Sequence, residues 1–192
     1  MKKTQVSKIV VLVVITIVAI IAVGIFTLNK PINQSEAAFL EKYGLSGLTV
    51  QEIVQKLDST TSDPMGLKAS IDSKHLVLMD DNAEVRLALP KDEFYLSFAP
   101  YLTQTHPCAI HSLASCRGEL VNREIYAVII DSTGREIVRS NFTTMENGFV
   151  GVWLPRNIDG TLTVSYNGLV AQAPIKTHAG SDTCLTTPLR LN

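Results

Sequence analysis

Two of the three cysteines and two of the four histidines lie together in the segment 104–119. They are His106, Cys108, His111 and Cys116. Thiolate and imidazole ligands together suit copper(I) and zinc, whereas carboxylate-rich clusters suit calcium or magnesium. The remaining cysteine, Cys184, lies near the C-terminus, and a fold that returned it to this loop would complete a site of three or four ligands. The residue types therefore predict a soft-metal and thiol site.

The spacing of these residues leaves other interpretations open. The pattern Cys-x2-His-x4-Cys differs from the paired Cys-x2-Cys of common zinc modules. Because three cysteines cannot all pair within one chain, Cys108 and Cys116 could form a structural disulfide and leave Cys184 buried as a small apolar residue. That alternative is a disulfide-stapled extracellular binding module with no metal. A Cys-His hydrolase using His111 or His178, and a thiol oxidoreductase, are disfavoured because the chain has neither a nucleophile-elbow pattern nor a Cys-x-x-Cys motif.

Thiols in this loop could also act as reductants. Two cysteines that form a disulfide release two electrons, which is enough to convert two copper(II) ions to copper(I). A neighbouring imidazolium lowers the pKa of a cysteine and keeps its thiolate reactive. The cysteines could therefore reduce a metal as well as hold it, in a thiol-dependent reaction rather than the turnover of a conventional enzyme.

An N-terminal apolar segment predicts export across a membrane. The run 9–28 has 20 residues without a charge, and lysines precede it. A helix of this length spans the roughly 30 Å hydrocarbon core of a bilayer and exceeds the about 7–15 residues of a signal-peptide core. We expect residues 1–30 to anchor the chain in the cell membrane, with the N-terminus in the cytoplasm and the rest outside. The alternative is a signal segment cleaved near Ser35, which would give a secreted or periplasmic protein.

The remainder of the chain is long enough for one ordinary domain, and it is acidic. About 160 of the 192 residues follow the apolar segment. Four of the 17 basic residues precede residue 31, which leaves 13 against 18 acidic residues and a net charge of −5. This balance argues against nucleic acid as a partner and does not repel cations. Outside the cytoplasm disulfides persist, so an unpaired thiol there requires protection or a bound metal.

Local patterns predict a polar linker at 31–36 and then a helical and hairpin region at 37–103. The first helix is expected at 37–43, where apolar residues recur at helical spacing. A second helix, running through residue 57, begins at a capping-box pattern. In this pattern the Thr49 side chain accepts from the backbone three residues on, and Glu52 reaches back.

The second half of the chain has the pattern of a β-sandwich-like module at 120–192. Short apolar strands alternate there with turn residues at spacings of about 8–12 residues.

Over the whole chain, hairpin turns are expected at 80–82 and at Asn167-Gly168. The predicted strands are 69–79, 84–89, 94–98, 124–130, 135–139, 148–154, 161–166, 169–175 and 183–191. We therefore expect an α+β fold, in which a small N-terminal helix and hairpin region is followed by the Cys/His metal loop at 104–119 and the C-terminal module.

Several long segments together resemble a known protein family. They include the loop with the first two cysteines, a glycine- and aromatic-rich strand, and the segment with the last cysteine. In order, they are FYLSFAPY at 94–101, QTHPC at 104–108, HSL at 111–113, CRGEL at 116–120, NGFVGVWLPR at 147–156, GTLTV at 160–164 and DTCLTT at 182–187. From about Phe39 to the C-terminus, the chain resembles the CueP family of extracytoplasmic copper-binding proteins.

The resemblance implies a role in copper resistance. Copper would be bound outside the cytoplasm, copper(II) reduced to copper(I) by cysteines, and the ion stored or passed on. The functional cysteines of the family correspond to Cys108, Cys116 and Cys184, as thiolate ligands and electron donors, and His111 and then His106 match as imidazole ligands. The implied partners are copper ions, a copper-accepting protein, a thiol reductant and, as in some relatives, a second copy of the chain; zinc is an alternative ion. Most relatives are soluble with cleaved signals, whereas the apolar run here suggests an anchored form.

Overall fold

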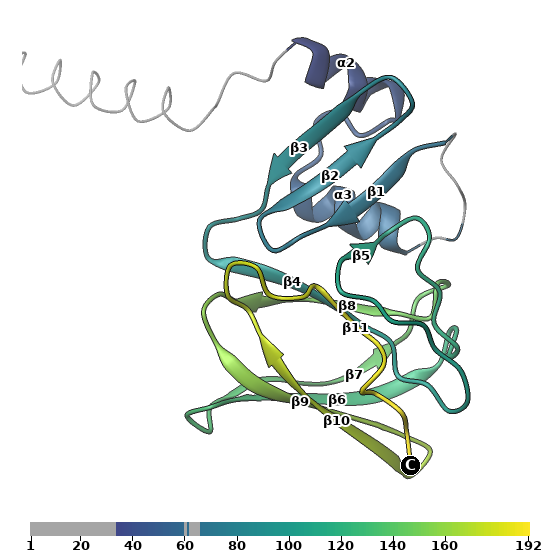
Figure 1. Ribbon diagram of the computed structural model, residues 1–192, viewed down its shortest axis with the longest axis vertical. Helices are drawn as coiled ribbons and strands as arrows, with labels where there is room; N and C mark the ends of the chain where they lie inside the picture. The colour runs from purple at the N-terminus through teal and green to yellow at the C-terminus, as the bar shows by residue number, and fades with distance from the viewer. Residues whose placement is uncertain (1–33, 60, 62–65) are drawn as a thin grey trace, which may run out of the picture. The chain divides into compact units, whose positions relative to one another are not determined.

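A computed structural model describes residues 34–59, 61 and 66–192 of the chain (Figure 1). The chain divides into two units, 1–41 and 42–192. The predicted anchor at 1–30 and the first residues of the predicted linker lie outside the described residues. Among the residues that are described, no helix combines the length and the apolar character needed to cross a membrane.

Within the described part of the chain, two helices precede the strands. Helix α2 (Gln34–Lys42) begins three residues earlier than expected, so that residues 34–36 are helical rather than linker. Helix α3 (Val50–Asp58) begins as predicted, because the Thr49 side chain accepts from the backbone of Glu52 and the Glu52 side chain accepts from the backbone of Thr49. The inward face of α3 is apolar except for its last residue, and its buried members are Ile53, Val54, Leu57 and Asp58.

A four-stranded sheet lies beside α3 (Figure 1). Its strand order is β3-β2-β1-β5, with β1 (Lys68–Ile71), β2 (His75–Met79), β3 (Glu84–Ala88) and β5 (His111–Ser112). The predicted hairpin is confirmed between β2 and β3, where the Asp80 carboxylate accepts from the backbone N–H groups of Asn82 and Ala83. The segment 69–79, expected as one strand, is two strands, because the Asp72 carboxylate accepts from two backbone N–H groups and turns the chain.

The rest of the unit is a β-sandwich, as predicted. One sheet has the order β10-β9-β6-β7, with β6 (Glu124–Asp131), β7 (Glu136–Thr143), β9 (Asp159–Tyr166) and β10 (Leu169–Lys176). The other has the order β11-β4-β8, with β4 (Glu93–Phe98), β8 (Val150–Pro155) and β11 (Cys184–Leu185). Alternate residues of both sheets point inward and form one core, which includes Phe94, Leu96, Phe98, Ile125, Ile129, Val152, Leu154, Leu162 and Val164. The predicted α+β class with a sandwich-like C-terminal module is confirmed.

Strand β4 belongs to the sandwich, although it falls within the predicted region 37–103. It pairs antiparallel with β8 and parallel with β11. Because side chains alternate along a strand, the sandwich core receives Phe94, Leu96 and Phe98, while Tyr95 and Ser97 point to the opposite face. Both faces of β4 are buried. Its second face, which carries Tyr95 and Ser97, therefore lines the space between the sandwich, α3 and the first sheet.

The last strand is shorter than predicted. The segment 183–191 was expected to be one strand, but β11 contains only Cys184 and Leu185. The backbone then turns, with the N–H of Leu189 donating to the carbonyl of Thr186, and meets the chain again in a bridge to Tyr101. Pro188 explains the break, since proline has no N–H to donate to a sheet.

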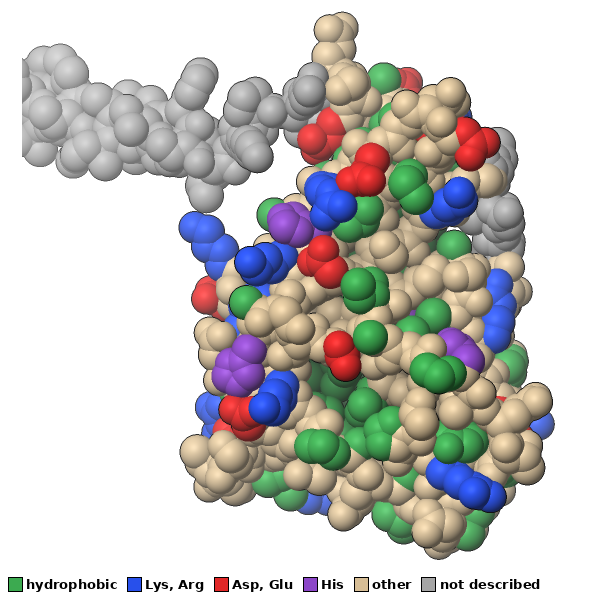
Figure 2. Space-filling model, in the orientation of Figure 1, with side chains coloured by type: hydrophobic (Ala, Val, Ile, Leu, Met, Phe, Trp, Pro, Cys, Tyr) green, Lys and Arg blue, Asp and Glu red, His purple; other side chains and the backbone are tan. Residues whose placement is uncertain are grey.

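Charged side chains are mixed on the surface. On the face drawn in Figure 2, basic and acidic side chains are interspersed, and no single large area of one sign is present on that face. Exposed charges of this kind are screened within about 8 Å at physiological salt. Surface charge on this face therefore steers ions only weakly, and any selectivity for a metal has to come from a site.

Candidate metal centre

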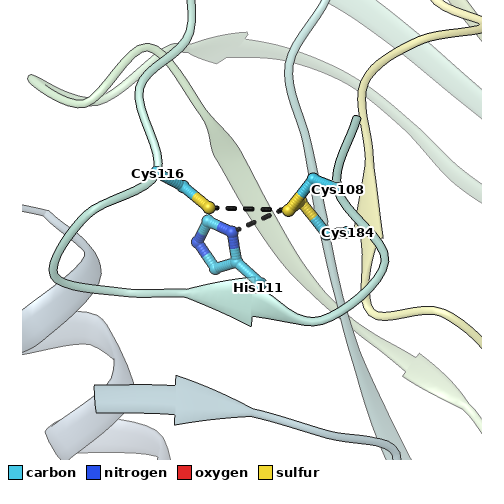
Figure 3. A group of neighbouring side chains, drawn as sticks. All are labelled: Cys108, His111, Cys116 and Cys184. Carbon is cyan, nitrogen blue, oxygen red and sulfur yellow. Dashed lines mark hydrogen bonds between the residues drawn. A yellow bond between two sulfur atoms is a disulfide. The ribbon is translucent and has the colours of Figure 1, made fainter. Parts of the chain in front are cut away.

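Four of the five predicted ligand side chains form one cluster (Figure 3). They are Cys108, His111, Cys116 and Cys184, and their ligand atoms all lie within 4.8 Å of one another. His111, Cys116 and Cys184 are buried, whereas Cys108 is partly exposed. The fold thus brings the C-terminal cysteine back to the loop, and the four groups are close enough to share one ion.

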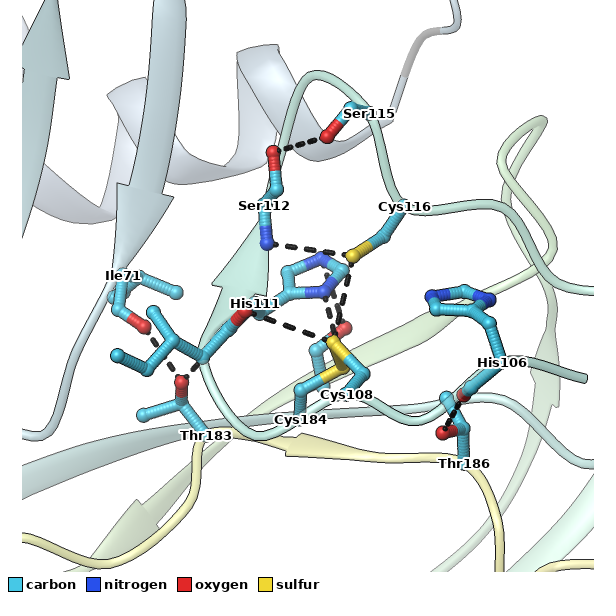
Figure 4. Close-up of a disulfide and its surroundings, with 12 residues drawn as sticks. Ile71, His106, Cys108, His111, Ser112, Ser115, Cys116, Thr183, Cys184 and Thr186 are labelled. Carbon is cyan, nitrogen blue, oxygen red and sulfur yellow. Dashed lines mark hydrogen bonds between the residues drawn. A yellow bond between two sulfur atoms is a disulfide. The ribbon is translucent and has the colours of Figure 1, made fainter.

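Backbone pairing positions His111 and Cys184. Strand β5 pairs with β1, which places His111 opposite Ile71, and β11 pairs with β4, which places Cys184 opposite Ser97. Thr183 ties the two strands together, because its hydroxyl accepts from the N–H of His111 at 3.1 Å and donates to the carbonyl of Ile71 at 2.5 Å (Figure 4). Two residues from distant parts of the chain are therefore held on rigid elements.

Cys108 and Cys184 form a disulfide, and Cys116 is the free, buried cysteine. The expected alternative, a structural disulfide between Cys108 and Cys116, is therefore wrong. The carbonyl of Ala109 accepts from the N–H groups of Thr183 and Cys184, which draws the backbone of Cys108 beside that of Cys184. The two Cα atoms are 5.4 Å apart, within the usual range for a disulfide.

The free thiol of Cys116 remains next to the disulfide. Its sulfur is 3.5 Å from the sulfur of Cys108. A tight turn holds it there, since the N–H of Cys116 donates to the carbonyl of Ser112 and the N–H of Ser112 points at the sulfur at 3.4 Å. Burial raises the pKa of Cys116, but hydrogen bonds with His111 and His106 outweigh burial and lower that pKa to about 7. A substantial share of this thiol is therefore thiolate at neutral pH, the form that binds metals and gives electrons.

The two ring nitrogens of His111 face different surroundings. Nε2 lies 2.7 Å from a carboxylate oxygen of Asp58 and 3.1 Å from the hydroxyl of Ser97. Nδ1 lies 3.7 Å from the sulfur of Cys184, on the side of the sulfur atoms. Burial lowers the pKa of His111, but the hydrogen bonds with Asp58 and Cys116 prevail and raise it to about 9. A metal ion at Nδ1 would take the place of a proton there.

Asp58 was not predicted as part of the site. It is fully buried and also accepts from the Tyr95 hydroxyl at 2.6 Å and from the Asn147 side-chain amide at 2.7 Å. A signal was present in the sequence: Asp58 follows Val54 by four residues, so it lies on the apolar stripe of α3, where a carboxylate requires partners. The Tyr95 side chain passes directly over Gly151 to reach Asp58. A larger residue at position 151 would not fit, because its Cβ atom would overlap the tyrosine ring.

His106, the second predicted imidazole, lies at the edge of the cluster (Figure 4). It is not one of the four groups whose ligand atoms are mutually close, but its hydrogen bond with Cys116 places it beside that sulfur. The Thr186 hydroxyl donates to its carbonyl at 2.6 Å, which ties this part of the loop to the segment after β11. His178, the weaker candidate, is instead paired with Asp159 at 2.9 Å.

Two surface pockets border the cluster. One, of about 510 Å³, has both disulfide cysteines in its wall, together with Pro107, Ala109 and Leu185 among others. The second, of about 270 Å³, is lined by His106 and by polar and charged neighbours that include Glu119. The disulfide and the His106 side of the cluster are thus each within reach of the solvent.

Glu119 fixes the backbone turn that leads to Cys108. Its carboxylate accepts from the Thr103 hydroxyl at 2.5 Å and from the backbone N–H groups of Leu102 and Thr103 at 2.6 and 2.9 Å. The Thr103 hydroxyl is the main cause that lowers the pKa of Glu119 to about 2. Ionised Glu119 therefore fixes the turn that precedes His106 and Cys108.

We expect Glu119→Gln to lower the free energy of unfolding by about 1 kcal/mol at pH 7, allowing for its partial exposure. The pKa of Glu119 in the folded protein lies below its ordinary value of 4.5, so the contribution is complete above about pH 5 and is lost as the pH falls towards 2. Urea unfolding at pH 7, 4 and 3 should show the gap between wild type and variant closing with acid. The exposed Glu146→Gln serves as the control, and a gap that does not change with pH would contradict the assignment.

Comparison with known proteins identifies the family of the chain. Residues 52–189 match the model of the family described as periplasmic copper-binding protein CueP. The crystal structure of S.CueP has a TM-score of 0.79 and 47% sequence identity to this chain, and the alignment covers 84% of this chain and 100% of that one. A search of curated protein sequences found no match. The matched residues include all four members of the cluster and His106, and the chain therefore belongs to the CueP family of periplasmic copper-binding proteins.

Proposed function

We propose that the protein binds copper through Cys108, Cys116, Cys184 and His111, with His106 as a further imidazole beside them. The observation that carries this proposal is the convergence of three sulfur atoms and Nδ1 of His111 within 4.8 Å. Thiolates and imidazole are the donors that copper(I) prefers. Family membership supports copper as the ion, although the same donors would also accept zinc.

We further propose that the cysteines reduce copper(II). The disulfide joins two of the proposed ligands, so it is the product that the reaction would leave. Starting from the reduced protein, the thiols of Cys108 and Cys184 first lose their two protons to water. The resulting thiolates form one S–S bond and release two electrons, and each of two copper(II) ions takes one of them. Cys116, His111 and His106 remain as ligands after this oxidation.

This reaction requires two partners, a thiol reductant and a copper-accepting protein. Each cycle consumes one dithiol, so a thiol reductant has to restore Cys108 and Cys184 before copper(II) can be reduced again. Cys108 is the partly exposed partner of the disulfide and lies in the wall of the 510 Å³ pocket, where an external thiol could reach it. A copper-accepting protein would then remove copper(I) from the cluster.

The sequence of residues 9–28 supports a tether for this site. We infer that the uncharged run of 20 residues holds the copper-binding unit at the outer face of the cell membrane. Cell fractionation tests this directly: the full chain should sediment with membranes and stay there in high salt, and a variant with three arginines in the run should not. Recovery of a shortened chain in the soluble fraction would support a cleaved signal segment instead.

X-ray absorption at the copper edge tests the proposed ligands. The reduced protein loaded with copper(I) should show a first shell dominated by sulfur with a smaller contribution from imidazole nitrogen. The Cys108→Ser, Cys116→Ser, Cys184→Ser triple variant should lose the sulfur shell. A shell of nitrogen and oxygen only in the wild type would show that copper binds elsewhere.

A structural disulfide without metal is the second candidate function. The observed Cys108–Cys184 bond favours it, because the bond joins residues 76 positions apart and ties the loop at 104–119 to the C-terminal segment. It does not account for Cys116 and His111. A bond that served only as a staple would not need a free thiol 3.5 Å away and a buried histidine beside it.

A further inference from the structure

Asp58 contacts a proposed copper ligand without being in the ligand group itself. The residue is fully buried, and one carboxylate oxygen lies 2.7 Å from Nε2 of His111. The other oxygen accepts from the hydroxyl of Tyr95 at 2.6 Å. The Asn147 amide donates to the first oxygen at 2.7 Å and to the backbone carbonyl of Asp58 at 2.8 Å. Both carboxylate oxygens already accept hydrogen bonds, from Tyr95 and from Asn147, so we assign the contact with His111 as a hydrogen bond that Nε2 donates to Asp58.

Asn147 is itself held in place, which makes the position of the carboxylate independent of any metal. Its side-chain oxygen accepts from the N–H of Phe149 at 2.9 Å, and its backbone carbonyl accepts from Gly118 at 2.6 Å. Helix α3, strand β4 and the turn before β8 thus all supply groups that hold Asp58 in place before copper binds. The Phe149 ring packs against the His111 ring, with centroids 4.8 Å apart, and limits its rotation.

With the hydrogen held on Nε2, the lone pair of a neutral His111 ring is on Nδ1. This is the nitrogen that faces the sulfur atoms (Figure 3). A carboxylate that holds the outer N–H of a metal-bound histidine orients the ring and makes the other nitrogen a better ligand. We propose that Asp58 is a positioning residue that selects Nδ1 of His111 as the copper-binding nitrogen and orients it toward the cysteines. The proposal rests on the proposed copper function.

Copper(I) affinity tests the role of Asp58. Reduced wild type and Asp58→Asn are compared by competition with a chromogenic copper(I) chelator, and we expect a loss of about 10- to 100-fold. Tyr95→Phe is the matched control, because it removes another hydrogen bond from the same carboxylate and leaves the contact with His111; it should change the affinity less than about threefold. In a His111→Ala background, Asp58→Asn should cause no further loss. An equal loss with and without His111 would overturn the proposal, since it would indicate a general effect on the fold.

The ring of His111 provides a test that needs no variant and whose first step needs no copper. In ¹⁵N NMR of the reduced, copper-free protein, at a pH where the ring is neutral, we expect the hydrogen on Nε2. Addition of copper(I) should then shift the Nδ1 resonance most. A hydrogen on Nδ1, or copper on Nε2, would overturn the proposal even if Asp58→Asn failed to fold. If the wild type showed the expected tautomer but took up no copper, the proposed function would fail while the positioning by Asp58 stood.

Discussion

Replacing Cys184 with serine is expected to lower the copper(I) affinity of the reduced protein by roughly 100-fold, and Cys108→Ser should have a similar effect. Structural zinc sites with four thiolate and imidazole ligands contribute about 10–16 kcal/mol to metal binding, and on the same scale each ligand of a copper(I) site accounts for about 3 kcal/mol. Both sulfur atoms lie in the same cluster, and both thiolates would therefore bind the same ion. Competition with a chromogenic copper(I) chelator measures the affinity.

Ser115→Ala is the matched control for these variants. Ser115 is exposed in the turn just before Cys116, and its hydroxyl donates only to the Ser112 hydroxyl, at 2.7 Å. We expect no change in copper affinity. If Cys184→Ser bound copper(I) as tightly as the wild type, Cys184 would not be a ligand, and the disulfide would be a structural staple only.

Reduction of the disulfide should lower the free energy of unfolding by about 2–4 kcal/mol in the absence of copper. The bond between Cys108 and Cys184 spans 76 residues, and opening it restores conformational freedom to that long loop in the unfolded chain. Urea unfolding with and without a reductant measures the difference. Copper(I) should then restore stability to the reduced protein, because an ion that binds only the folded state stabilises it.

The Cys108→Ala, Cys184→Ala double variant serves as the control for that experiment. Its unfolding midpoint should be the same with and without reductant, and close to that of the reduced wild type. A wild-type midpoint that does not respond to reductant, in a sample whose disulfide is shown to be open, would contradict the assigned role of the bond in stability.

Local sequence patterns predicted the elements that depend on near neighbours. The capping box at Thr49 and Glu52 and the hairpin after β2 form as expected, because the hydrogen bonds involved join residues within a few positions of each other. The concentration of cysteine and histidine in 104–119 also identified the loop that contributes three of the four clustered side chains. These signals lie within one turn or one hairpin, so no knowledge of the tertiary fold was needed.

The features that sequence patterns missed depend on long-range packing. The disulfide partner of Cys108 is set by backbone hydrogen bonds between Ala109 and β11, which no spacing rule reveals. Strand β4 precedes the loop at 104–119 and is buried on both faces, so neither its position in the chain nor its residue pattern indicated that it belongs to the sandwich. Asp58 was overlooked because its partners lie 37, 53 and 89 residues away. The only local signal for its role was that a single acidic residue lies on the apolar face of α3.

An anaerobic copper(II) titration of the reduced protein tests the central claim most directly. Free thiols and copper(I) are counted at each step, the latter with a chromogenic chelator. The account predicts that one thiol is lost for each copper(I) formed, up to two per chain, and that the triple Cys→Ser variant forms no copper(I). Thiols that stay unchanged while no copper(I) appears would contradict a reducing copper site, and would leave the cluster as a disulfide beside an unused thiol.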